Sequence, residues 1–226
     1  MSPAIRKRLV QIGLMVLIQA VALFVSAWKW AWWNAWVYLV LYLVYLAFNA
    51  VVLLGKHKDL VEERSQVGEG SKSWDKIIGM ITGVGGFAIL ILSGLDERFG
   101  WQGVVPFWLQ VAAFVLLGLS YPFFTWAMVS NKFFSTIVRI QKDRGHTVQT
   151  GGPYRFIRHP GYASLLVSYV SIPIALGSWW ACIPMGVLVV NLLIRTALED
   201  RTLKKELEGY IDYAGQVRYR LIPGIW

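Results

Sequence analysis

Residues 34–54 read NAWVYLVLYLVYLAFNAVVLL and contain no charged side chain. An apolar run of roughly 20 residues is long enough to cross the ~30 Å hydrocarbon core of a bilayer as a helix. On either side of this stretch, five further runs of similar character occur in the chain. They lie at about 9–28, 77–95, 104–128, 161–177 and 180–197. The sequence therefore predicts an all-α integral membrane protein with about six transmembrane helices.

The composition agrees with a membrane environment. Of the 226 residues, 56% are apolar and only 15% are charged, with a mean hydropathy of +0.51. A soluble domain carries about 25% charged residues, so this chain has too little charge to cover a water-exposed surface. The single cysteine, Cys182, excludes a disulfide scaffold. The same numbers exclude a disordered or collagen-like chain.

The distribution of charge predicts the topology. The formal net charge is +9, from 22 basic and 13 acidic residues, which by itself is compatible with nucleic-acid binding. Six spans, however, place both termini and 20 of the 22 basic residues on one side, and leave only Lys29 and Arg98 opposite. Positive charge marks the cytoplasmic side. We therefore expect cytoplasmic termini and no nucleic-acid partner, and the short loops are typical of a prokaryotic inner-membrane protein.

Tryptophan is concentrated at the ends of the spans that lie away from the basic loops. Tryptophan accumulates at membrane–water interfaces, where it anchors a helix in the lipid. Lipid anchoring is the expected role of nine such residues: Trp28, Trp30, Trp32, Trp33, Trp36, Trp101, Trp108, Trp179 and Trp180.

The chain is expected to form a single membrane domain over residues 1–226. Its first four spans occupy 1–128, and residues 129–226 hold a long polar loop, a helical hairpin and a tail. The loop at 55–76 is interpreted as a flexible connector, with a lid over the site as the less favoured alternative. The tail from 198 begins as an amphipathic continuation of the sixth span and then turns at its Pro-Gly pair. Chemistry is expected on this cytoplasmic side, because the outer loops are short.

Two short motifs in the long loop have chemical potential. Residues 151–154 read GGPY and residues 158–162 read RHPGY. Paired glycines allow a turn that exposes N–H groups, and Pro160 suits the first turn of the fifth span. A helix N-terminus beside Arg158 and His159 favours a bound carboxylate or phosphate. The alternative is that Arg155 and Arg158 contact lipid phosphates and His159 caps the helix.

A second polar group lies at the cytoplasmic end of the sixth span. Arg195 and Glu199 are four residues apart and so share one helix face, with Asp200 next in sequence. Such residues can simply snorkel to the interface. If they face a cavity beside the long loop, they form a polar pocket at membrane depth, which is a functional hypothesis by default.

Taken together, these motifs resemble the isoprenylcysteine carboxyl methyltransferase family, whose members are integral membrane enzymes that use S-adenosyl-L-methionine. The similarity covers roughly residues 120–223. It consists of GPYRFIRHPGY at 152–162, two apolar spans, RTALED at 195–200, and a tail from Tyr210 to Pro223 that ends in VRYRLIP. The order and spacing of the whole set carry the resemblance, since the RHP triplet alone is unspecific.

The resemblance implies a cofactor pocket that faces the cytoplasm, and it assigns residues to that pocket by position. Arg195 matches the family's substrate-binding arginine, and with Glu199 it is the expected catalytic pair. Ser164 stands where the family often has glycine, and Ala197 and Leu198 stand where other members carry more carboxylates, which leaves the substrate open. The implied cofactor contacts are Gln141, His146, Thr147, Val148, Gln149, Tyr154, His159, Pro160, Gly161, Tyr162 and Glu199.

The acceptor is expected to be a lipidated or lipophilic molecule that reaches the site from the bilayer. Methyl transfer from a sulfonium depends mainly on positioning and electrostatics. A carboxylate acceptor needs only a cation to orient it, which Arg195 can supply. An amine acceptor, such as a phospholipid headgroup, must first lose a proton to Glu199 or His159. The absence of a dedicated base favours O-methylation over N-methylation.

Two other function classes stay open. Membrane sterol reductases are similar in their last helices and bind NADPH in a comparable place, and a non-catalytic scaffold needs no cofactor. The three histidines and Cys182 show no metal-ligand spacing, so no metal is expected. No GxGxxG motif follows a strand, which excludes a soluble Rossmann methyltransferase domain.

Overall fold

The computed structural model describes residues 3–56, 60, 72–101 and 103–226, and this part of the chain contains helices, turns and loops but no strand. Two short 3₁₀ turns, η1 (Lys142–Arg144) and η2 (Gly152–Arg155), interrupt the long loop. The α-helices are α1 (Pro3–Ala27), α2 (Trp33–Lys56), α4 (Ser73–Phe99), α5 (Phe107–Val129), α6 (Pro160–Ala175), α7 (Cys182–Glu206) and α8 (Tyr210–Gln216).

Each of the six predicted apolar runs coincides with one helix. Five helices are long and apolar enough to cross a membrane, and α6 is a shorter apolar helix of 16 residues. The predicted all-α, multi-pass membrane fold is therefore confirmed. Helix α7, which holds the sixth apolar run, continues well beyond that run to Glu206, as expected from the amphipathic pattern. The connector predicted at 55–76 lies mostly outside the described residues, and its last residues form the first turn of α4.

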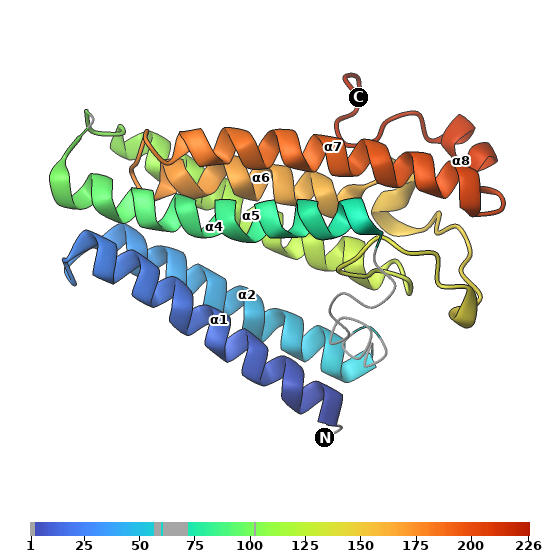
Figure 1. Cartoon of the computed structure of the whole chain (residues 1–226), viewed down its shortest axis with the longest axis horizontal. Helices are drawn as coiled ribbons and strands as arrows, with labels where there is room; N and C mark the ends of the chain where they lie inside the picture. Colours follow the sequence, from blue (N-terminus) through green and yellow to red (C-terminus); the bar gives the residue numbers. More distant parts are fainter. Residues whose placement is uncertain (1–2, 57–59, 61–71, 102) are drawn as a thin grey trace.

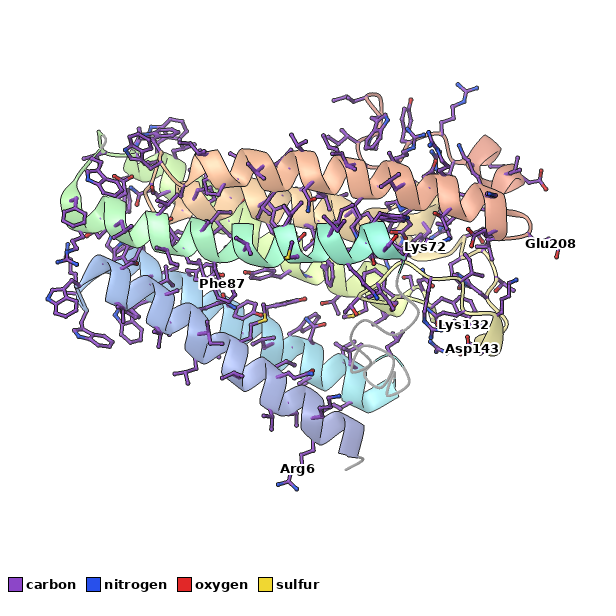
Figure 2. The ribbon with its side chains drawn as sticks, in the orientation of Figure 1. Arg6, Lys72, Phe87, Lys132, Asp143 and Glu208 are labelled. Atoms are coloured by element: carbon purple, nitrogen blue, oxygen red, sulfur yellow. The ribbon has the colours of Figure 1, made fainter. Side chains whose placement is uncertain are left out.

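The two ends of the helix bundle differ sharply. Figure 1 shows the N-terminus, the long loop after α5 and the short helix α8 at one end, and the tight turns after α1, α4 and α6 at the other. Figure 2 shows polar side chains such as Lys132, Asp143 and Glu208 at the end that holds the long loop. The segments predicted to share one side of the membrane thus lie together.

Small polar residues bring α5 and α6 close together. Ser120 of α5 lies 2.9 Å from Ser168 of α6, Oγ to Oγ, and Ser164 donates to the Ser120 carbonyl at 2.6 Å. All three serines are buried. Small residues allow close helix packing in lipid, and their hydroxyl groups satisfy each other there. The packing fixes the start of α6, where the RHPGY motif lies.

A glycine allows the close approach of α1 and α4. A Cβ atom at Gly94 would overlap Ser26 Oγ and lie 2.9 Å from the backbone N of Ala27 and the carbonyl O of Leu23.

The predicted lipid-anchoring role is wrong for one of the nine tryptophans. Trp32 is only 2% exposed and belongs to the core cluster at the tight-turn end of the bundle, because the turn after α1 folds it inward.

Candidate functional site

A cavity lies at the loop end of the bundle, between the long loop, the start of α6, the end of α7 and the residues that lead into α8. Phe133 and Phe134 of the loop and Tyr210 of α8 contribute aromatic walls. The predicted cofactor residues that line this cavity are His146, Thr147, Val148, Gln149, Tyr154, His159, Gly161, Tyr162 and Glu199.

Glu199 is the half-buried acidic side chain of the cavity. The Tyr162 hydroxyl donates a hydrogen bond to Glu199 Oε2, so the first turn of α6 and the end of α7 are joined at the cavity wall. The Tyr162 ring stacks on His159, with centroids 5.7 Å apart and planes 7° from parallel. Within the described part of the chain, no basic side chain forms an ion pair with Glu199. Its carboxylate is therefore available to a cation.

Gln141 does not line the cavity, contrary to its expected place there, but it holds the loop in shape. The buried Gln141 side chain donates to the Phe133 carbonyl at 2.7 Å and accepts from Arg144 Nη1 at 2.7 Å. Its backbone N–H donates to His146 Nδ1 at 3.3 Å. Burial, followed by the charges of Arg139 and Arg144, lowers the pKa of His146 to about 4. His146 is therefore neutral at pH 7 and can accept this bond.

Asp200 organises the floor beneath the cavity. Its side chain is 1% exposed and receives Arg158 Nε at 2.8 Å, Arg220 Nε at 3.1 Å and the Tyr210 hydroxyl at 3.0 Å. His159 Nε2 lies 3.5 Å from the same carboxylate. Burial and the charge of Asp200 raise the pKa of Tyr210, which keeps its hydroxyl protonated as a donor. A buried carboxylate requires such partners.

These contacts correct the interpretation of the RHPGY motif. The Arg158 guanidinium binds a carboxylate of the protein itself, Asp200, and donates to the carbonyls of Val217 and Arg218, both at 2.7 Å. His159 precedes α6 but its side chain forms no capping bond. Backbone bonds from Arg158 to Tyr219 O and from His159 to Arg220 O, both 2.9 Å, fasten the tail beneath the loop.

Arg195 shares a helix face with Glu199, but among the described residues its ion pair is with Asp75. It is not among the cavity-lining residues, and its Nη2 forms an ion pair with Asp75 Oδ1 at 2.9 Å and donates to the Thr136 carbonyl at 2.9 Å. The guanidinium carbon lies 5.5 Å from the centroid of the Tyr162 ring. Arg195 therefore lies next to the cavity and contacts its wall. Pro160, the first residue of α6, also lies outside the lining set.

Several residues of the site were not predicted. Phe134 closes one side, and a Cβ at Gly161 would lie 2.9 Å from its ring, so glycine is needed for this approach. Asp75 gave a signal that could have been used: it is a carboxylate at the edge of an apolar span, where a charge needs a partner. Nothing in the sequence pairs Asp75 with Arg195.

Within the described residues, no group of three or more His, Cys, Asp or Glu side chains could hold a metal.

Comparison with known families supports the resemblance seen in the sequence. Residues 111–205 match the model of the isoprenylcysteine carboxyl methyltransferase (ICMT) family, whose members are membrane methyltransferases. The matched segment begins earlier than the predicted 120–223 and ends at residue 205, before the predicted motif that starts at Tyr210. No curated protein matches the sequence significantly. Since the match spans α5 to α7 and the loop that lines the cavity, this part of the multi-pass membrane chain is ICMT-like.

Proposed function

We propose that the protein is an S-adenosylmethionine-dependent methyltransferase that methylates the carboxylate of a lipidated or lipophilic acceptor at the cytoplasmic face of the membrane. The observation that carries the proposal is the position of Glu199. Its carboxylate lines the cavity within the ICMT-like segment, and among described side chains its hydrogen bond comes from Tyr162 alone.

The side chains around the cavity fit the chemistry of S-adenosylmethionine. This molecule combines a cationic sulfonium, an amino-acid end and an aromatic base, and when bound it supplies an electrophilic methyl group. Glu199 offers a negative charge without a cationic partner, which suits the sulfonium or the ammonium group. The Phe133 and His146 rings, with centroids 4.3 Å apart, offer apolar aromatic surface for the base. Thr147 and Gln149 add polar groups beside them.

Arg195 is the proposed partner of the acceptor's carboxylate. Its Nε is buried and has no hydrogen-bond partner within the described part of the chain, so one donor is unused. A carboxylate oriented by this donor is already a nucleophile at neutral pH. Its oxygen bonds to the methyl carbon as the carbon–sulfur bond breaks, the electron pair stays on sulfur, and no proton moves. The protein's contribution is thus orientation and charge.

The cytoplasmic location of the site is also a proposal. It is supported by the excess of basic residues in the segments that Figure 1 places at the loop end of the bundle. Positive charge is retained on the cytoplasmic side during membrane insertion. The apolar part of the acceptor would remain in the bilayer while its polar end enters the cavity.

Calorimetric titration of detergent-purified protein with S-adenosyl-L-methionine, which carries both the sulfonium and the ammonium charge, tests the proposal. Binding is expected for the wild type and is expected to weaken by at least about tenfold in Glu199→Gln, which keeps the size of the side chain but removes its charge. Glu208→Gln changes an exposed carboxylate outside the cavity and is the matched control. Binding of NADPH instead would assign the protein to the reductases, and binding of neither by folded protein would refute the proposal.

A further inference from the structure

Asp75 and Arg195 form a buried ion pair next to the cavity. Asp75 lies in the first turn of α4, with its side chain 1% exposed and its Oδ1 2.9 Å from Arg195 Nη2 on α7. Its Oδ2 accepts a hydrogen bond from the backbone N–H of Val138 at 2.8 Å. Val138 itself lines the cavity. The carboxylate therefore joins α4, α7 and the cavity-lining loop at a single point.

The position of the guanidinium follows from these contacts. Nη2 is held by Asp75 and by the Thr136 carbonyl, and the guanidinium carbon lies over the Tyr162 ring, 5.5 Å from its centroid. Nε is left without a hydrogen-bond partner among the described residues. A long arginine side chain at a membrane interface would otherwise sample many rotamers and extend to water. The ion pair removes that freedom and compensates the charge.

We propose that Asp75 is a positioning residue and the resting counter-ion of Arg195, with which the acceptor's carboxylate competes for the guanidinium. The inference rests on the proposed function, since it takes Arg195 as the partner of that carboxylate. An incoming carboxylate shares the guanidinium with Asp75, and two negative charges around one cation repel each other. The methyl ester carries no charge, so the Asp75–Arg195 pair is restored as the ester forms. The counter-ion thus favours release of the product over retention of the acceptor.

Asp75→Asn separates positioning from charge compensation. The amide oxygen of asparagine can still accept from Val138 N–H, while the negative charge is lost. The probes are N-acetyl-S-farnesylcysteine, a minimal isoprenylated carboxylate, and its neutral methyl ester, each titrated by calorimetry into protein saturated with S-adenosylhomocysteine. The affinity for the acid is expected to rise about three- to thirtyfold in Asp75→Asn, which lies within the range of measured couplings between contacting residues. The affinity for the ester is expected to stay within about twofold of wild type, which is the scatter observed for residues that do not interact.

The double variant Asp75→Asn/Arg195→Gln shows whether the gain passes through Arg195. The gain in acid affinity should disappear in it, and Asp212→Asn, an exposed carboxylate on α8, should change neither affinity. Equal weakening of acid and ester in Asp75→Asn, no change in either, or a gain that persists without Arg195 would each overturn the inference.

The proposed function has its own readout in the same titrations. Failure of wild-type protein to bind S-adenosylhomocysteine refutes the methyltransferase proposal. Binding of S-adenosylhomocysteine without binding of the acid by any variant refutes the carboxylate acceptor, and the role of Asp75 with it. Binding of both, without a gain in Asp75→Asn, refutes the role of Asp75 alone.

Discussion

Asp200→Asn should release the C-terminal tail from the floor of the cavity. The wild-type carboxylate is 1% exposed and holds Arg158, Arg220 and Tyr210 at 2.8–3.1 Å. Removing one partner from a buried ion pair costs about 3–5 kcal/mol. Asparagine keeps one acceptor oxygen, and Arg158 keeps its bonds to two tail carbonyls. The low end, about 3 kcal/mol, is therefore expected, which raises the open population of the tail about a hundredfold.

Limited proteolysis measures this opening directly. Trypsin cleaves after Arg218, whose carbonyl accepts from Arg158 in the closed tail, so cleavage requires the tail to detach. When opening and closing are fast, the rate of cleavage follows the open population. The cleavage rate should rise about a hundredfold in Asp200→Asn and stay at the wild-type value in Asp212→Asn. Equal rates in the two variants would show that Asp200 does not hold the tail, and the account of the cavity floor would be wrong.

Two further predictions concern packing and pH. Gly94→Ala places a methyl group against the backbone of α1 and should destabilise the bundle by about 1–3 kcal/mol, measured as a lower thermal midpoint in detergent. Gly86→Ala, which has open space at its Cβ, should leave the midpoint unchanged. Equal midpoints in the two variants would contradict the close crossing of α1 and α4. His146 has a folded-state pKa of about 4 against an ordinary 6.5, so the unfolded chain binds a proton first and stability should fall as pH drops through this window. In His146→Gln that part of the pH profile of the thermal midpoint should be flat, and an unchanged slope would refute the buried, neutral state.

The transmembrane helices could be predicted from the sequence because length and apolarity decide them locally. The run at 34–54 lies within α2, which differs from it by only a few residues at its ends. The inward turn of Trp32 could not be predicted, since it depends on how the chain reverses between α1 and α2. Apolarity specifies that a residue avoids water, but it does not distinguish lipid from a protein core.

The cavity was predictable to the extent that its residues are close in sequence or belong to the family pattern. His146, Gly161 and Glu199 line it as expected. The role of Arg158 was misjudged because its partner Asp200 lies 42 residues away, on α7. The Asp75–Arg195 pair joins residues even further apart. Sequence spacing gives the partners within one helix, whereas pairs between helices depend on the packing of the bundle.

Ion pairs within the protein compensate much of the positive charge around the cavity. The protein has a net charge of +9, and three arginines at or beside the cavity pair with carboxylates. Arg158 pairs with Asp200 and Arg195 with Asp75, while Arg139 pairs with Asp143 four residues away. His146 is held neutral by its surroundings. Glu199 thereby remains as a negative group without a cationic side chain among the described residues. In the proposed orientation the basic surface faces the cytoplasm, while Glu199 offers a negative group to a bound cation such as a sulfonium.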